Sequence, residues 1–254
     1  MQGSDFLHSV IVQFEDFKNP FPALERYQHK YSCFNDDIQG TGAVILSGII
    51  NGLKQTGKPV KDQRAVFMGA GSAGVGVARQ IVEFFVKEGL SEDEARRRFW
   101  FVDTKVRALL DERCKGNVLT LVKGLITNDR GDKLAQHKIY FSRDDNDGQQ
   151  FKTLSQVVEY VKPTILMGLS TIRGIFDKSI LQRMAQLNEK PIIFPLSNPS
   201  NNAECTFEEA VQYTDGRVIF ASGSPFEPYA WKEKMLVPSQ GKYVGRYRFG
   251  DANS

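Results

Sequence analysis

One glycine-rich stretch, residues 64–81, constrains the fold of this chain more than any other. A short apolar run over residues 65–68 leads into Gly69-x-Gly71-x-x-Gly74, and apolar residues at helical spacing follow. This order predicts a strand, a tight turn and a helix. The first glycine of such a unit makes the turn, the second lets a pyrophosphate approach the backbone, and the third lets helix and strand pack closely. The stretch predicts a dinucleotide site, and its alternative is a glycine turn with a structural role alone.

The rest of the chain predicts strands that alternate with helices. Apolar runs with the length of buried strands occur at residues 10–14, 99–103, 139–142, 164–167, 191–196 and 217–220. Helices are expected at residues 23–31, 41–54, 92–98, 153–161, 177–188 and 206–213. Ser91 and Thr206 each begin a capping-box sequence, which marks the start of a helix. The alternation predicts an α/β fold, a doubly wound parallel sheet with helices on both faces.

Small or polar residues follow several of the predicted strands. They are the glycine stretch 69–74, Asp103, and residues 168–170, 197–199 and 223–224. In a parallel sheet these positions share the carboxyl edge, where ligands of such folds bind. Asp103 holds the place of an acid that hydrogen-bonds the adenosine ribose, unless it simply ends its strand. Thr104 and Lys105 come next and would suit a 2′-phosphate, so NAD and NADP both remain open as cofactors.

Two acidic pairs stand near the start of the chain. Glu15 and Asp16 follow the predicted strand at 10–14, and Asp36 and Asp37 precede the long apolar helix at 41–54. In one interpretation Asp36 or Asp37 caps that helix and the first pair is solvated. In the other, the carboxylates converge on a hard cation such as Mg²⁺ or Mn²⁺, which prefers oxygen ligands.

Composition excludes several classes of function. A net charge of +3 over 254 residues gives no reason to expect nucleic acid or an anionic membrane as a partner. No run of about 18 apolar residues is present, and the first residues do not form a signal or transit peptide. The three cysteines fit no metal-ligand spacing and are typical of free thiols, so we expect an intracellular protein. None of the three histidines follows a predicted strand, which disfavours histidine acid–base catalysis within this chain.

Six short motifs occur in the order that malic enzymes have. They are FEDF at residues 14–17, CFNDDIQGT at 33–41, GAGSAG at 69–74, IFPLSNP at 193–199, AEC at 203–205 and FASGSP at 220–225. Over residues 12–240 the chain resembles malic enzymes, in particular fungal-type members. The resemblance implies NAD(P)-dependent oxidative decarboxylation of (S)-malate to pyruvate and CO₂, assisted by Mg²⁺ or Mn²⁺, in a cytoplasmic or mitochondrial homo-oligomer. Two alternatives stay open: a non-catalytic nucleotide-binding or interaction module, and another Rossmann dehydrogenase.

The resemblance also assigns roles to individual residues. It implies metal ligands at Glu15, Asp16 and Asp37, and a substrate contact at Asn198. The cofactor-binding residues would be Asn19, Gly69, Ala70, Gly71, Ser72, Ala73, Gly74, Asp103 and Ser170. The family's catalytic tyrosine and lysine and its malate-binding arginine match no position in this chain. We therefore expect no catalytic residue within these 254 residues and no turnover of malate by the isolated chain. The resemblance implies a homo-oligomer for the family, and we do not extend that expectation to the isolated chain.

The family pattern also divides the chain. Residues 1–38 correspond to the end of the family's N-terminal domain, 39–240 to the NAD(P)-binding domain, and 241–254 to nothing in the pattern. Residues 106–123 interrupt the pattern as an insertion. Translated intron sequence would account for both anomalies, and a transcript that lacks the codons for 106–123 would support this hypothesis.

Overall fold

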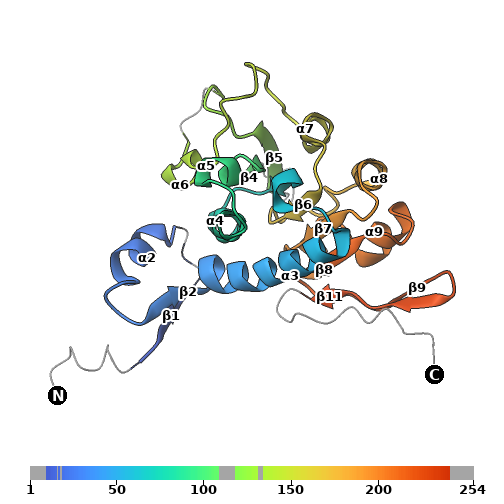
Figure 1. Ribbon diagram of the computed structural model, residues 1–254, viewed down its shortest axis with the longest axis horizontal. Coiled ribbons are helices and arrows are strands. Elements are labelled where there is room, and N and C mark those ends of the chain that lie inside the picture. Colours follow the sequence, from blue (N-terminus) through green and yellow to red (C-terminus); the bar gives the residue numbers. More distant parts are fainter. Residues whose placement is uncertain (1–9, 16, 18, 109–117, 131–133, 241–254) are drawn as a thin grey trace.

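The computed structural model describes residues 10–15, 17, 19–108, 118–130 and 134–240. Among these residues, seven strands form one sheet in the order β11-β8-β7-β6-β3-β4-β5 (Figure 1). The strands are β3 (Ala65–Met68), β4 (Phe99–Ala108), β5 (Val118–Leu125), β6 (Ile165–Gly168), β7 (Ile192–Pro195), β8 (Ile219–Ser222) and β11 (Ser239–Gln240). Strand β3, which leads into the glycine turn, lies inside the sheet between β6 and β4. The chain first builds outward to β4 and later returns to β6, so the turn lies at the switch point where such sheets bind ligands.

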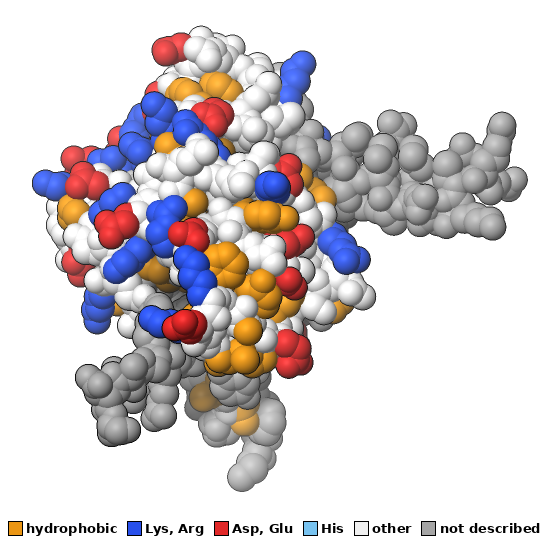
Figure 2. Space-filling model, turned by 90° about the vertical axis from the view of Figure 1, so that its right-hand side faces the viewer, with side chains coloured by type: hydrophobic (Ala, Val, Ile, Leu, Met, Phe, Trp, Pro, Cys, Tyr) orange, Lys and Arg blue, Asp and Glu red, His pale blue; other side chains and the backbone are white. Residues whose placement is uncertain are grey.

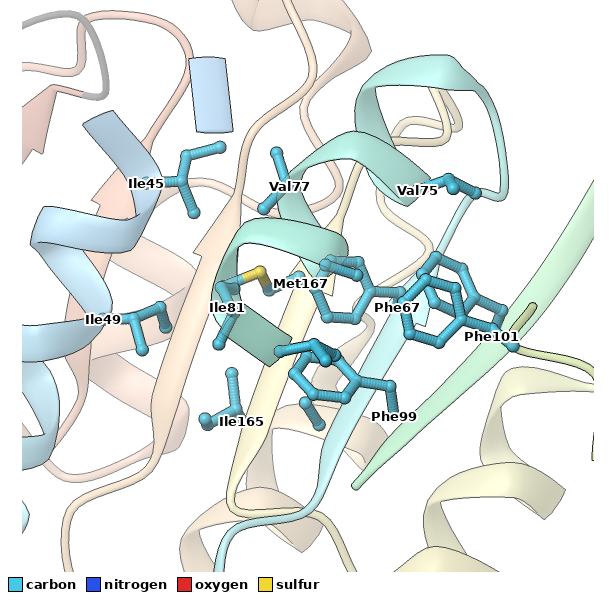
Figure 3. Close-up of a cluster of buried hydrophobic side chains, with 14 of the residues drawn as sticks. Ile45, Ile49, Phe67, Val75, Val77, Ile81, Phe99, Phe101, Ile165 and Met167 are labelled. Carbon is cyan, nitrogen blue, oxygen red and sulfur yellow. The ribbon is translucent and has the colours of Figure 1, made fainter. Parts of the chain in front are cut away.

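Helices cover both faces of the sheet, which confirms the doubly wound α/β prediction. One face carries α3 (Thr41–Thr56) and α4 (Ser72–Lys87), and the other carries α7 (Leu154–Val161), α8 (Lys178–Leu187) and α9 (Phe207–Tyr213). Strand β3 is buried along its whole length because alternate residues face opposite layers. Phe67 packs with Phe99 and Phe101 beneath Ile81 of α4 (Figure 3), whereas Val66 and Met68 face the other core.

The sheet departs from the prediction at one edge, where β5 pairs with β4 antiparallel. The expected strand at 99–103 continues to Ala108, and the chain returns as β5 within the stretch treated above as an insertion. The run Val118-Leu-Thr-Leu-Val has the apolar and β-branched composition of a strand, so the pattern was present in the sequence. The prediction of a wholly parallel sheet is therefore wrong for β5.

The prediction of a strand at residues 139–142 is also wrong. Residues Gln136–Ile139 form a short helix, α6, and only Arg143 makes an isolated bridge, with Thr127. Tyr140 packs edge-on against Phe141, whose ring contacts Phe99 and Phe101. The apolar run packs against the aromatic core and forms no strand. A run of four residues does not distinguish these two cases.

The N-terminal part forms a small unit beside the start of α3 (Figure 1). Strands β1 (Val12–Phe14) and β2 (Cys33–Asn35) pair in parallel, and α2 (Phe21–Tyr27) connects them. A π-helix, η1 (Asp36–Gly40), then leads directly into α3. Because β1 and β2 are parallel, the residues after Phe14 and after Asn35 reach the same edge.

The remaining elements are short. They are η2 (Val60–Asp62), α5 (Glu92–Arg96), η3 (Ser200–Asn202) and the hairpin of β9 (Tyr229–Trp231) with β10 (Lys234–Leu236). The capping boxes predicted at Ser91 and Thr206 are both formed, at α5 and α9. Positive and negative side chains are mixed over the face shown in Figure 2, in keeping with the small net charge. In the part of the chain that the structure describes, no helix has both the length and the apolar character needed to cross a membrane.

Candidate functional site

The glycine turn between β3 and α4 is held by two close approaches of backbone to backbone. Gly69 has φ +111°, and a Cβ there would lie 2.3 Å from the carbonyl oxygen of Leu169, the residue after β6. A Cβ on Gly74 would lie 2.6 Å from the carbonyl oxygen of Gly69. A side chain at either position would displace the turn or the β6 loop, so both glycines are required by packing. The third glycine thus packs on the turn itself, while its contact with Phe101 of β4 has ordinary length.

Gly71 differs because its surroundings are open. It is exposed, its backbone is extended, and no atom lies within 4 Å of where a Cβ would sit. It is the N-cap of α4, where no side chain caps the helix and no acidic residue stands in the first turn. Ala70 is buried, and Ser72 and Ala73 are half-buried at the start of the helix. An uncapped helix start beside open space presents backbone N–H groups and the positive dipole end, which together favour a phosphate.

Asp103 lies one strand away from this turn and is paired with two cations. Gly69 donates a backbone hydrogen bond to the Val102 carbonyl, which places Asp103 beside the turn. Its buried carboxylate contacts Arg130 Nη2 at 3.1 Å and Lys138 Nζ at 2.7 Å. The two cations offset the cost of burying this carboxylate. The site therefore offers both an acid and two cations beside the position expected for the adenosine ribose.

The loops after β6 and β7 meet at the buried carboxylate of Glu204. Glu204 Oε1 accepts hydrogen bonds from the Ser170 backbone N–H and hydroxyl, both at 2.8 Å, and from the Ser197 hydroxyl at 2.5 Å. Asn198 follows Ser197 directly and is exposed. Two of the predicted residues, Ser170 and Asn198, thus lie on loops that share one buried anchor.

The N-terminal acids lie at the edge where β1 and β2 end. Glu15 follows Phe14 and is exposed, and Asp37 lies in η1 two residues after Asn35; Asp16 lies outside the described residues. Neither Asp36 nor Asp37 caps the helix, because the buried side chain of Asn35 accepts the hydrogen bond of the Ile38 N–H at 2.9 Å. Asn35 also donates to the Phe14 carbonyl at 2.9 Å, which joins the two strand ends.

The carboxylates at this edge are ligands of the type that divalent cations prefer. The parallel pairing brings the backbone after Phe14 and the backbone after Asn35 to one edge, and Glu15 and Asp37 carry the oxygen ligands that Mg²⁺ and Mn²⁺ prefer. Within the described residues, which omit Asp16, no three carboxylate, imidazole or thiolate groups form a cation cluster.

The π-helix that carries Asp37 packs against the helix of the glycine turn. Gln80 of α4 donates its side-chain N–H groups to the carbonyls of Ile38 at 3.0 Å and Gln39 at 3.2 Å. Gly76 of α4 lies against Ile38, since a Cβ at Gly76 would be 2.9 Å from the Ile38 Cα. The candidate cation edge and the glycine turn are thereby fixed to the same helix.

Asn19 is exposed in the loop before α2. In the part of the chain that the structure describes, no hydrogen bond joins Asn19 to the glycine turn, whereas the neighbouring Phe21 stacks on His137 with ring centroids 5.5 Å apart. His137 makes a hydrogen bond with the Ala70 backbone. Burial, followed by the charge of Lys138, lowers the pKa of His137 below its ordinary value. Histidine 137 thus lies at the glycine turn, although it follows no strand.

A sequence model described as "Malic enzyme, NAD binding domain" matches residues 38–247. The chain belongs to the malic enzyme family. It is 52% identical to an NADP-dependent malic enzyme of Dictyostelium discoideum over 91% of this chain and 40% of that protein. It is 41% identical to the human NADP-dependent malic enzyme, over 94% of this chain and 38% of that protein. A mitochondrial NAD-dependent malic enzyme of Ascaris suum is 38% identical, over 91% of this chain and 33% of that protein.

Solved malic enzymes have the same fold. The malic enzyme of Pyrococcus horikoshii matches 90% of this chain and 48% of its own chain with a TM-score of 0.61 at 23% identity. The chain spans between a third and two fifths of the length of the curated relatives named above, in the part that carries the NAD-binding domain of the family. The resemblance to malic enzymes is confirmed, and its fungal-type part stays a prediction.

Sequence reasoning missed four residues that build this site: Asn35, Gln80, His137 and Glu204. Three of them fall within or beside quoted motifs or the glycine helix, so their positions were in view. Their partners lie 21 to 42 residues away in the hydrogen bonds from Asn35 to Phe14, from Gln80 to Ile38 and from Ser170 to Glu204. Spacing along the chain does not identify such partners. The acid between two apolar residues in AEC is the one signal that could have pointed to Glu204, because an acid in such a position is rarely buried without a role.

Proposed function

We propose that this protein acts as a malic enzyme, oxidatively decarboxylating (S)-malate to pyruvate and CO₂ with reduction of NAD or NADP. The observation that carries the proposal is the glycine turn at the switch point of the sheet, with an uncapped α4 and open space at Gly71. The family membership supports the same reaction. It disfavours another Rossmann dehydrogenase as the alternative.

When bound, the dinucleotide supplies the hydride acceptor, and Mg²⁺ or Mn²⁺ supplies polarisation of the C2 oxygen of malate. The first turn of α4, from Gly71 through Gly74, would hold the pyrophosphate with its backbone N–H groups. Asp103 with Lys138 would meet the adenosine ribose, the acid accepting a hydrogen bond from a ribose hydroxyl and the cation attracting a 2′-phosphate. The loop of Ser170 would border the cofactor, as would Asn19.

The other residues of the proposal concern the substrate. Glu15, Asp16 and Asp37 would hold the cation with carboxylate oxygens, and Asn198 would contact malate. The proposed division of the chain keeps 1–38, 39–240 and 241–254, and the family match over 38–247 supports the first boundary. A homo-oligomer and an intracellular, cytoplasmic or mitochondrial location stay predictions.

Calorimetric titration of the purified chain with NAD and with NADP tests the proposal. The expected result is saturable binding of at least one of them to folded protein. Binding of neither, with circular dichroism that shows a folded α/β protein, would contradict it. An assay with (S)-malate and Mn²⁺ that follows reduced cofactor and pyruvate then tests both the reaction and the prediction that these 254 residues alone give no turnover. Dinucleotide binding by a longer form of the protein that never oxidises malate would favour the non-catalytic module.

A further inference from the structure

The carboxylate of Glu204 is fully buried at the carboxyl edge of the sheet. It lies between η3 and α9, and its side chain runs across the end of β6, where a Cβ on Gly168 would lie 2.4 Å from its Cδ. Only a glycine at position 168 leaves room for the carboxylate. The acid and the end of β6 are therefore fitted to each other.

Four groups donate hydrogen bonds to this carboxylate, and all four belong to the loops after β6 and β7. Oε1 accepts from the Ser170 N–H, the Ser170 hydroxyl and the Ser197 hydroxyl, and Oε2 accepts from the Ser197 N–H at 3.4 Å. None of the ion pairs found among the described residues includes Glu204. Neutral donors alone therefore compensate the burial of the acid. Burying a carboxylate costs free energy unless it is hydrogen-bonded, so the acid holds both loops at its two oxygens.

The two anchored loops border the glycine turn and the predicted substrate residue. The Ser170 nitrogen lies 3.1 Å from where a Cβ on Gly69 would sit, so the first loop backs the turn directly. Ser197 directly precedes Asn198 on the second loop. One carboxylate thus sets the position of the loop behind the dinucleotide turn relative to the loop that carries Asn198.

We propose that Glu204 is a positioning residue that holds the β6 and β7 loops in register around the dinucleotide and malate. The proposal rests on the function proposed above. Glu204 touches neither ligand and acts through Ser170 and Ser197. Its loss should therefore weaken ligand binding in protein that is still folded.

The test compares Glu204→Gln with Glu209→Gln in the full chain. Glutamine keeps the size of the side chain but removes its charge and turns one acceptor into a donor, so the Ser197 N–H faces an N–H group while a neutral oxygen takes the place of Oε1. Glu209 is the matched control because, among the described residues, it accepts its hydrogen bonds from Thr206 in the capping box of α9, on the same segment. We expect NADP or NAD, whichever the parent binds, to bind Glu204→Gln about tenfold more weakly. Glu209→Gln should bind within about twofold of the parent.

Hydrogen exchange of the ligand-free proteins gives a second readout. The amides of Ser170 and Ser197 should exchange faster in Glu204→Gln than in the parent, and unchanged in Glu209→Gln. Should Glu204→Gln fail to fold, Ser197→Ala removes one donor and keeps the acid, and about threefold weaker binding is expected. Unchanged affinity in folded Glu204→Gln, with only a lower melting temperature, would reduce Glu204 to a structural role and overturn the proposal. If the folded parent binds neither dinucleotide, the proposed function fails instead, and the exchange rates still report whether Glu204 holds the loops.

Discussion

At the scale of single residues, the three glycines of the β3–α4 turn have different constraints. Gly74→Ala would place a Cβ 2.6 Å from the Gly69 carbonyl oxygen, and neither backbone segment can move freely. We expect the free energy of unfolding to fall by about 1–3 kcal/mol, as for other overpacked positions. Urea unfolding followed by circular dichroism measures this change. A stability equal to that of the parent would show that the turn does not have the close packing described here.

Gly71→Ala is the matched control and a test of the ligand site. No atom lies within 4 Å of the added Cβ, and the backbone suits any residue, so stability should stay within about 0.5 kcal/mol of the parent. Dinucleotide affinity should fall by about tenfold or more because the methyl group occupies the approach to the α4 N-terminus. Calorimetric titration measures the loss. Unchanged affinity would mean that the pyrophosphate does not approach at Gly71.

Sequence reasoning identified the residues whose role depends on their neighbours in the chain. It did less well for residues whose role depends on distant partners. The glycines and the capping residues Ser91 and Thr206 were found because their neighbours in the chain fix their conformation. The buried hydrogen bonds of Glu204 depend on how three loops meet, which no local pattern contains. Asp103 was predicted at the right edge, but its ion pairs with Arg130 and Lys138 were not, because those cations come 27 and 35 residues later in the chain.

At the scale of elements, the contact between α4 and the π-helix joins the two halves of the candidate site. Gln80→Leu would leave the carbonyls of Ile38 and Gln39 without the donor that the structure shows. We expect a loss of stability of about 1–3 kcal/mol, because buried acceptors are left unsatisfied. Mn²⁺ affinity, measured by calorimetry, should fall together with the ordering of Asp37. Asn51→Ala, which removes an exposed hydrogen bond within α3, should change neither quantity. A loss of stability without any loss of cation affinity would show that Gln80 does not support cation binding at this edge.

The contact of α6 with the glycine turn predicts a pH dependence. Burial, Lys138 and Arg79 lower the pKa of His137, while the Ala70 backbone and Asp103 act in the opposite direction. Because the folded pKa lies below the unfolded one, the unfolded state takes up the proton first as the pH falls. Stability should therefore drop on acidification from neutral pH through about 6.5, the ordinary value. Melting temperatures between pH 8 and pH 5 should show a smaller drop for His137→Gln than for the parent. The same drop in His137→Gln, with His29→Gln as the exposed control, would assign the effect to other groups.

The errors among the predicted elements have related causes. The strand at 139–142 was inferred from a short apolar run, yet those side chains belong to an aromatic cluster that also includes Phe99 and Phe101. Strand β5 was overlooked because most of its residues, 118–123, were set aside as an insertion, although they pair with the second half of β4, from Thr104 to Ala108. Periodicity is informative for long elements and ambiguous for runs of four or five residues.

At the scale of the whole molecule, the sheet gathers the candidate ligand groups at one edge. The glycine turn after β3 and the loops after β6 and β7 lie at carboxyl ends of parallel strands, and Asp103 lies where the parallel pairing of β4 with β3 ends. Two helical layers bury both faces of the central strands, which makes the sheet a rigid support for these loops. This arrangement followed from the alternation of strands and helices in the sequence. The antiparallel edge strand did not, because antiparallel pairing depends on a connection that the pattern does not specify.

Hydrogen exchange of the chain with and without saturating NADP, repeated with NAD, tests the central claim that a dinucleotide binds at this edge. The account predicts slower exchange at the first-turn amides of α4, from Ser72 to Val75, and in the loop of Ser170. Amides of the β9–β10 hairpin should not change, since Trp231 of β9 lies against Gly216, which precedes β8 and so is at the opposite edge of the sheet. Saturable binding that protects other segments and leaves the start of α4 unchanged would contradict the account.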